Sequence, residues 1–245
     1  MPKLEYDFKA ATPETGRREN GIDVSSYGEY PYTLFSPFSY SPDYQIPVPG
    51  QDNEFACSVE SIWQGLKLIN GSTDFRLFGL RPRKRKGIVQ GHLLGSQVIG
   101  LVEARKEIYM PSYFFHVQKN VPQEIKDNLL EKALTDDVLL YDVEENLDID
   151  DDSSPLAHSV FLAMFLNQYK DGRLDEIQGE IEKAYSTQEQ EHETLAEPLV
   201  RGAELFGSLS GSQKALAIYI LGNPPLKMDV FHKRYYGKLL EKVSR

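Results

Sequence analysis

The chain has few of the features that would assign it to a class at once. Cys57 is the one cysteine among 245 residues, which excludes an internal disulfide framework and favours a reducing compartment. No apolar run is long enough to span a bilayer, and the polar N-terminus lacks the apolar core of a signal peptide. We therefore expect a cytoplasmic protein that makes no contact with a membrane.

Basic charge is also scarce. The sequence has 27 Lys and Arg residues against 37 Asp and Glu residues, which gives a net charge of −10. Because a protein that wraps duplex DNA needs a basic face, we expect no strong binding of duplex nucleic acid, although local recognition of phosphate stays open. Hydrophobic residues make up 40% of the chain, which is enough for a folded core.

Several motifs of known chemistry are absent. The sequence has no Walker loop, no Rossmann glycine pattern, no kinase signature and no Gly-x-Ser-x-Gly elbow. Its histidines show no metal-ligand spacing; they stand at positions 92, 116, 158, 192 and 232. The acidic run 144–152 lacks the glycine turn and the distal glutamate of a calcium loop, so a solvated loop is the favoured interpretation. We expect neither a metal nor a cofactor.

The most organised pattern lies in a predicted helix over residues 57–69. Its apolar residues recur at helical spacing on one face: Val59, Ile62, Leu66 and Ile69. A second row at the same spacing is polar and aromatic: Glu60, Trp63, Gln64 and Lys67. One interpretation is an ordinary amphipathic helix with an exposed polar side. The other is the floor of a small-molecule site, which the lone tryptophan favours because an indole suits a stacking wall in a pocket.

The residue types in the polar row suit cleavage of a glycosidic bond. A carboxyl group such as that of Glu60 beside an aromatic wall can act as a general acid when burial raises its pKa, or stay ionised and stabilise a cationic sugar. Loss of a nucleobase from ribose passes through such an oxocarbenium-like state. Lys67 could pair with Glu60, or could serve as an amine nucleophile if its pKa is lowered.

Two loops are candidates for completing this site. The proline-rich aromatic loop 31–50 cannot be a helix or a central strand, and it is either a pocket wall or core cover. The basic cluster 81–87 is either a solvated loop or a phosphate clamp built from Arg83, Lys84 and Lys86, because arginine forks and lysine charges match phosphate oxygens.

The second half of the chain supplies two more candidates. An apolar strand over 138–142 ends in Asp142, and the ends of strands commonly deliver pocket residues. His158 lies in the first turn of a predicted helix over 156–169, and its ordinary pKa suits proton transfer near neutrality. Either residue could instead be structural.

The remaining pattern concerns the organisation of the chain. Helical spacing predicts helices over 92–109, ended by Pro111, and over 122–134. Beyond residue 169 the composition becomes rich in Glu, Gln and Lys. We therefore expect a ligand-binding domain over 1–169 and a helical C-terminal extension over 170–245. The extension would pack on the core, or provide a surface for a homo-oligomer or a protein partner.

The polar row also carries a family resemblance. The segment Ser58-Val59-Glu60-Ser61-Ile62-Trp63-Gln64-Gly65-Leu66-Lys67 resembles the Ser-Val-Glu-His-x-(aromatic)-Gln-x-x-Lys helix of the NADAR superfamily, the NAD- and ADP-ribose-associated proteins. Residues 34–38 look like its Pro-Phe loop, and the likeness covers roughly residues 30–169. It implies a compact, mostly helical α+β fold with a small sheet, and an N-glycosidase activity. Glu60 takes the place of the active-site glutamate of that superfamily, whereas Ser61 stands where histidine is usual.

Together these observations predict an N-glycosidase or ADP-ribosyl hydrolase that acts on a nucleotide-like or ADP-ribosylated nucleobase substrate. The predicted catalytic residues are Glu60, Lys67, Asp142 and His158. The predicted substrate-binding residues are Ser36, Phe38, Trp63, Gln64, Arg83, Lys84, Lys86, Arg105 and Tyr109. Two alternatives stay open. One is a non-catalytic nucleotide- or ADP-ribose-binding module whose helical tail binds a protein partner, and the other is an accessory protein of DNA modification or phage defence.

Overall fold

The computed structural model describes residues 6–133 and 135–186, and the side chains of the last helix up to residue 173. These residues belong to two compact units. The larger is formed by Phe8–Pro122 and Leu139–Phe165, and the smaller, among the described residues, by 6–7, 123–133, 135–138 and 166–186. Most of the extension expected over 170–245 lies outside the described residues, so the division at residue 170 stays a prediction.

The fold is α+β, and one of its small sheets contains the predicted strand. Strand β8 (Val138–Tyr141) lies between β1 (Phe8–Ala10) and β2 (Ile22–Asp23). It pairs in parallel with β2, with Ile22 opposite Leu140. The strand expected over 138–142 is therefore confirmed, and Asp142 follows directly after its last residue.

A second sheet is joined to the helix that carries the polar row. Helix α2 (Val59–Leu66) begins at Ser58, whose side chain accepts a hydrogen bond from the Ser61 N–H at 3.1 Å. The chain then turns into β5 (Lys67–Ile69), which pairs antiparallel with β6 (Val89–Leu94). The expectation of a helix over the whole of 57–69 was wrong at its end, because the partner strand β6 takes the last residues into a sheet.

The helix expected over 92–109 was wrong in its first half. Residues 89–99 form the hairpin of β6 and β7 (Gln97–Ile99), with Gly95 in a left-handed conformation at the turn (φ 60°). An apolar residue every few positions fits a short strand as well as a helix, so periodicity alone could not separate them. The paired strands give the backbone the partners that a helix would otherwise supply.

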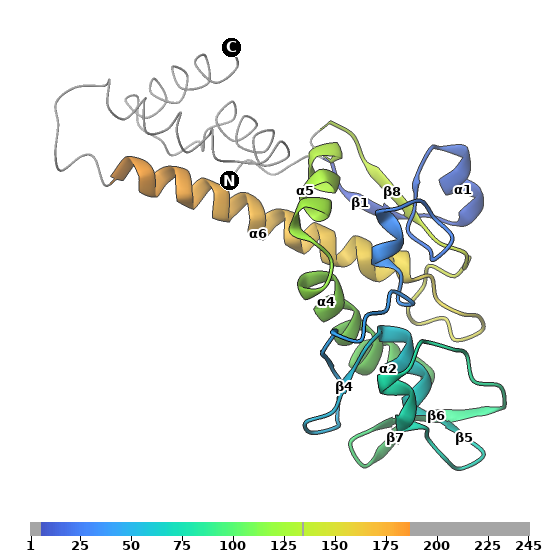
Figure 1. Ribbon diagram of the computed structural model, residues 1–245. Helices are drawn as coiled ribbons and strands as arrows, with labels where there is room; N and C mark the ends of the chain where they lie inside the picture. The colour runs from blue at the N-terminus through green and yellow to red at the C-terminus, as the bar shows by residue number, and fades with distance from the viewer. Residues whose placement is uncertain (1–5, 134, 187–245) are drawn as a thin grey trace, which may run out of the picture. The chain divides into compact units, whose positions relative to one another are not determined.

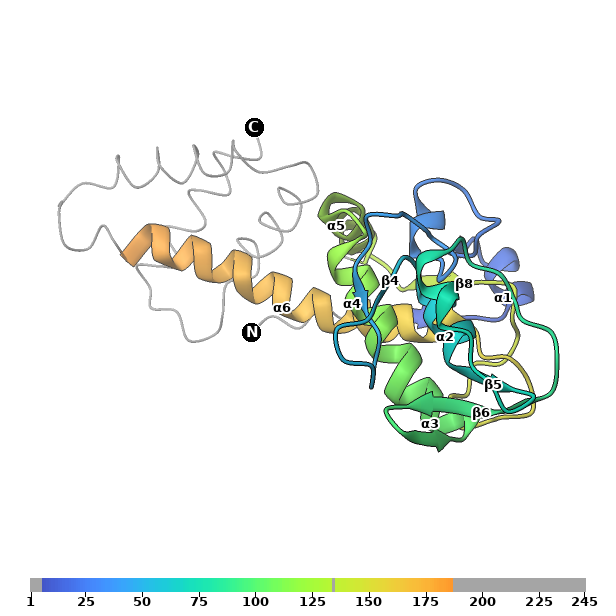
Figure 2. The same ribbon diagram turned by 60° about the horizontal axis from the view of Figure 1, so that its bottom comes forward.

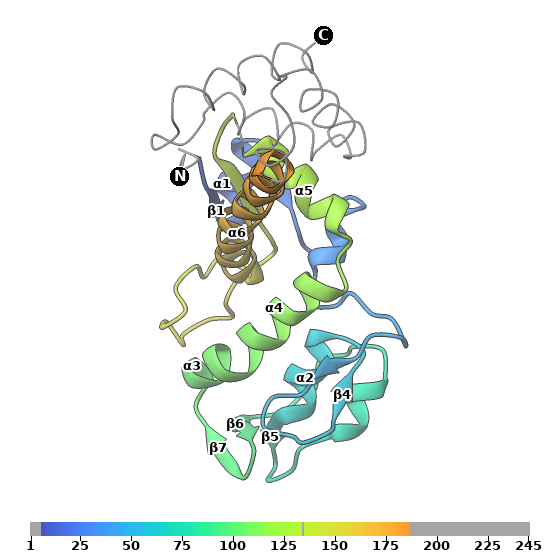
Figure 3. The same cartoon turned by 90° about the vertical axis from the view of Figure 1, so that its left-hand side faces the viewer.

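One helical run follows this hairpin. It consists of α3 (Leu101–Ala104), the π-helical turn η3 (Arg105–Tyr109) and α4 (Met110–Lys119), which succeed one another without a break (Figure 3). The expected stop at Pro111 was also wrong. Proline has no N–H to offer, and the helical run passes it directly after the π-helical turn η3, where the regular α-helical hydrogen-bond pattern is already interrupted.

The other elements complete the two units. They are α1 (Pro13–Arg18), η1 (Tyr32–Phe35), β3 (Ile46–Pro47), β4 (Phe55–Ala56), η2 (Phe75–Gly79), α5 (Gln123–Lys132) and α6 (His158–Ser186). The helices expected over 122–134 and from 156 onward are confirmed by α5 and α6 (Figure 1).

The core of the larger unit gathers around α2. This helix contacts both β6 and α4 (Figure 2), and the predicted apolar stripe of Val59, Ile62 and Leu66 is fully buried. The proline-rich loop 31–50 carries Phe35, which is buried and whose carbonyl accepts a hydrogen bond from the Tyr113 hydroxyl at 2.7 Å.

The smaller unit holds a buried polar cluster of its own. The Asp127 carboxylate accepts a hydrogen bond from the Tyr169 hydroxyl at 2.9 Å, and Lys170 donates to the Tyr6 carbonyl at 3.0 Å. Within the described ranges, no helix has both the length and the apolar character needed to cross a membrane.

Candidate functional site

The larger unit contains a cavity of about 760 Å³. Its walls come from α2, the start of β5, the strand β6, the turn η3, and the segments that follow β2, β8 and η1. A volume of this size is typical of sites for small-molecule ligands.

The cavity brings together most of the residues that the sequence singled out. All the predicted catalytic residues line it. The predicted binding residues that line it are Ser36, Phe38, Trp63, Gln64, Lys84, Arg105 and Tyr109. Arg83 and Lys86 do not line it; in the basic loop Lys84 and Arg85 do.

Glu60 is a buried carboxyl group in this cavity. The residue is 5% exposed, and the Gln64 Nε2 donates a hydrogen bond to its Oε1 at 2.7 Å. Burial raises the pKa of the Glu60 carboxyl, and this effect outweighs the opposing influence of Gln64 and of the nearby charges of Lys67, Lys84 and His158. The shift moves the carboxyl toward the range in which a group can both give and take a proton.

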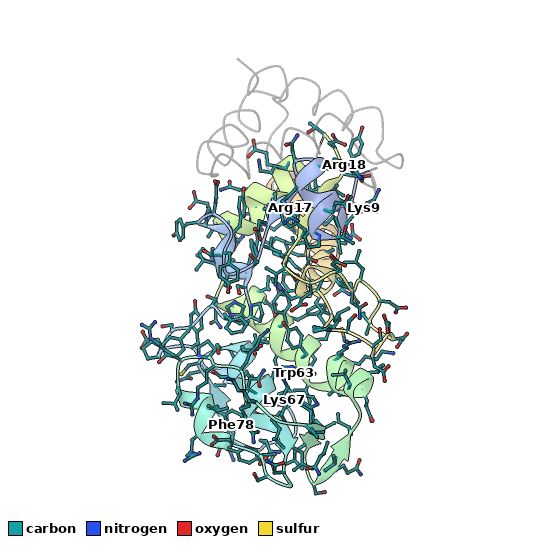
Figure 4. The ribbon with its side chains drawn as sticks, turned by 90° about the vertical axis from the view of Figure 1, so that its right-hand side faces the viewer. Lys9, Arg17, Arg18, Trp63, Lys67 and Phe78 are labelled. Atoms are coloured by element: carbon teal, nitrogen blue, oxygen red, sulfur yellow. The ribbon has the colours of Figure 1, made fainter. Side chains whose placement is uncertain are left out.

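Lys67 places an amine beside that carboxyl. Burial lowers its pKa, and the charge of Glu60 opposes the shift. Its Nζ lies 5.8 Å from the centre of the Trp63 ring, and the two side chains are seen together in Figure 4. It forms no salt bridge with any residue in 6–133 or 135–186. In the same view Lys9 lies well away from Trp63, and it does not line the cavity.

His92 is a cavity residue that sequence reasoning missed. The pairing of β5 with β6 sets it opposite Lys67, and its ring stacks on Trp63 with the ring centres 3.9 Å apart. Burial lowers its pKa to about 3, with a smaller contribution from the Lys67 charge, so the imidazole is neutral. Neither ring nitrogen has a hydrogen-bond partner in the part of the chain that the structure describes. No spacing could have found it, because only the strand register joins it to α2.

Asp142 and His158 form a buried pair in another wall of the cavity. The His158 Nδ1 lies 2.6 Å from the Asp142 Oδ2, and the His158 Nε2 lies 3.0 Å from the Val24 carbonyl oxygen. The Asp142 carboxylate also accepts the backbone N–H groups of Glu144 at 2.7 Å and Ser159 at 3.2 Å. Burial alone would raise the pKa of Asp142, but the His158 contact together with these N–H groups lowers it.

This geometry bears on the catalytic role expected for His158. Both of its ring nitrogens face acceptor oxygens of the protein. A proton transfer to a ligand would have to break the contact with Asp142 or with Val24. In the structure His158 joins the segments of Val24 and Asp142, and its predicted catalytic role stays a prediction.

The side chains of Arg85 and Arg105 donate hydrogen bonds to backbone carbonyl groups. The Arg85 N–H donates to the Gln64 Oε1 at 3.0 Å, which fixes the orientation of the amide that holds Glu60. Its guanidinium donates to the carbonyls of Gln64 and Lys67 at the end of α2. Arg105, predicted to bind substrate, donates to the carbonyls of Ile149, Asp151 and Ser154, in and just after the acidic run. These hydrogen bonds hold that segment through its backbone carbonyls.

No cluster that could hold a metal ion occurs among the described residues.

The fold and the cavity together define an α+β protein whose larger unit encloses a polar and aromatic site. Residues 10–162 match a family described as a family of unknown function, DUF6939, and the chain belongs to that family. The matched residues include every residue that lines the cavity. Comparisons with curated proteins and with solved structures gave no significant match.

Proposed function

We propose that the protein binds a nucleotide-like or ADP-ribosylated nucleobase ligand in this cavity and hydrolyses its N-glycosidic bond. The observation that carries the proposal is Glu60, a carboxyl group that is buried in a ligand-sized cavity and has a raised pKa. Lys67 and Lys84 supply positive charge near it, which suits a phosphate-bearing ligand. The resemblance of α2 to the NADAR helix motif gives the same assignment to Glu60.

The chemistry assigns both proton transfers to Glu60. Protonated Glu60 gives its proton to the departing nitrogen of the base as the bond between that nitrogen and the sugar carbon breaks. The Glu60 carboxylate formed in this way then takes a proton from the water that attacks the sugar carbon, which restores the acid. The products are the free base and the sugar with a new hydroxyl group.

The hydrogen bond from Gln64 makes the two oxygens of this carboxyl unequal. Oε1 is held at 2.7 Å by the Gln64 amide, whose own oxygen accepts the Arg85 N–H, so the amide cannot flip without losing that bond. Oε2 makes no hydrogen bond to any described residue. We assign the proton transfer to Oε2.

The test is product release from ADP-ribosylated guanine and from ribosides of the riboflavin pathway, followed by chromatography. The wild-type protein should release product, and Glu60→Gln should reduce the rate about 100-fold or more, the usual range for a lost general acid. Glu54→Gln, an exposed carboxyl outside the cavity, is the matched control. Equal release by wild type and Glu60→Gln would contradict the proposal, and binding without release would support the non-catalytic binding module instead.

A further inference from the structure

Exposed apolar side chains surround the mouth of the cavity. Tyr27 is 84% exposed, Val143 is 57% exposed and Val89 is 43% exposed, yet all three line the cavity. A residue that is both lining and exposed must lie where the cavity opens. These three come from separate segments, after β2, after β8 and at the start of β6. We call this set the apolar rim.

The turn that presents Tyr27 is held by hydrogen bonds. The Asp23 carboxylate accepts the Ser25 N–H at 2.9 Å, and the Ser25 Oγ accepts the Tyr27 N–H at 3.1 Å. The Gly28 N–H donates to the Ser25 carbonyl at 3.2 Å, and any side chain at Gly28 would clash, because its Cβ would lie only 2.3 Å from the Asp23 carbonyl oxygen. A large aromatic ring is thus carried into solvent on an ordered turn, which lowers the entropy lost when it binds.

The buried pair braces two parts of this rim. His158 bonds the Val24 carbonyl, three residues before Tyr27, and Asp142, the residue before Val143. The Asp142 Oδ1 also accepts the Glu144 N–H, so the turn around Val143 is fixed from both sides. The Asp142–His158 pair therefore sets the distance between the two segments that carry Tyr27 and Val143.

We propose that the apolar rim is a subsite for a planar, uncharged ring of the ligand, of the size of a purine. The assignment rests on the proposed function in taking the ligand to be nucleotide-like. Apolar side chains cannot bind the charged part, which pairs with Lys67 and Lys84. A tyrosine ring and two valines offer the flat, apolar contact that a base needs. The ring of the ligand thus lies at the opening, where a larger group attached to it can extend into solvent.

The experiment uses Trp63, the one tryptophan of the chain, as a fluorescent reporter inside the cavity. Wild-type protein is titrated with adenosine 5′-monophosphate and with ribose 5-phosphate, which lacks the ring. Tyr27→Ala should weaken binding of adenosine 5′-monophosphate about tenfold, the usual worth of one stacked base, and leave ribose 5-phosphate unchanged. Val143→Ala should act in the same direction by a smaller factor.

Tyr30→Ala is the matched control. Tyr30 is 79% exposed and lies three residues from Tyr27, but it does not line the cavity, so its loss should change neither affinity. The rim assignment is overturned if wild type does not bind adenosine 5′-monophosphate, if Tyr27→Ala binds it as well as wild type does, or if both ligands weaken equally. Turnover is measured on the same samples. Ring-dependent binding without turnover would uphold the rim and refute only the proposed hydrolysis.

Discussion

Replacing Asp142 by asparagine removes the charge from the buried pair while keeping the size of the side chain. The single oxygen of asparagine can accept from His158 and Ser159, but its amide nitrogen then faces the Glu144 N–H, two donors in opposition. Removing one partner of a buried ion pair typically costs about 3–5 kcal/mol. Since each kcal/mol lowers the melting temperature of a protein of this size by about 2–4 °C, we expect Asp142→Asn to lower it by roughly 6 °C or more.

Thermal unfolding followed by circular dichroism measures this loss. Asp150→Asn is the matched control, because the Lys106–Asp150 pair has a similar separation of 2.5 Å but is solvent-exposed, and exposed pairs contribute about 0–1 kcal/mol. A decrease in the melting temperature no larger than that of the control would refute the bracing role. Asp142→Asn should also weaken binding of adenosine 5′-monophosphate, since the turns that carry the rim lose their tie.

The stability that Asp142 contributes depends on pH. Its pKa is lowered in the folded chain, so the contribution is complete above the pKa of an aspartate in the unfolded chain and is lost as the pH falls through the lower folded value. The difference in melting temperature between wild type and Asp142→Asn should therefore narrow on acidification below about pH 4. A difference in melting temperature that stays constant over that range would show that the charge of the Asp142 carboxylate does not contribute to stability.

Two further substitutions test how α2 is held. Gly65→Ala would bring a Cβ within 2.4 Å of a ring carbon of Phe78 and should cost about 1–3 kcal/mol in the free energy of unfolding. Gly79→Ala is the control, because its Cβ would meet nothing within 4 Å. Equal melting temperatures for the two variants would contradict this packing. Arg85→Ala removes charged donors from the carbonyls at the end of α2 and should cost about 2 kcal/mol, against less than about 0.5 kcal/mol for exposed Arg83→Ala; urea titrations compare the two.

Sequence patterns predicted those elements in which local preference and tertiary packing agree. The strand before Asp142 is short, apolar and β-branched at its start, and the structure keeps it as the middle strand of a sheet. Helix α2 begins where Ser58 can cap it, a signal that lies within a few residues. Glu60, Trp63, Gln64 and Lys67 all line the cavity although Lys67 lies in a strand. The change from helix to strand occurs only at Lys67, the last of these four residues.

Long-range pairing decided the elements that sequence patterns predicted wrongly. Residues 92–99 have an apolar spacing that suits a helix, but β5 is available as a partner and converts them to a hairpin. The basic cluster posed a similar problem. Nothing local distinguishes Arg85 from Arg83, and only the carbonyls left free at the end of α2 draw one of them inward.

The register that brings His92 to the cavity also alters the role of Trp63. The indole was expected to stack on the ligand, but the neutral His92 ring covers one of its faces at 3.9 Å and Tyr109 meets it edge-on at 5.5 Å. The ammonium of Lys67 lies 5.8 Å from the centre of the same ring. With these neighbours, the indole is better suited to hold the Lys67 charge beside Glu60 than to receive a planar ligand. Stacking on the ligand then needs another aromatic ring, and at the mouth of the cavity the exposed Tyr27 offers one.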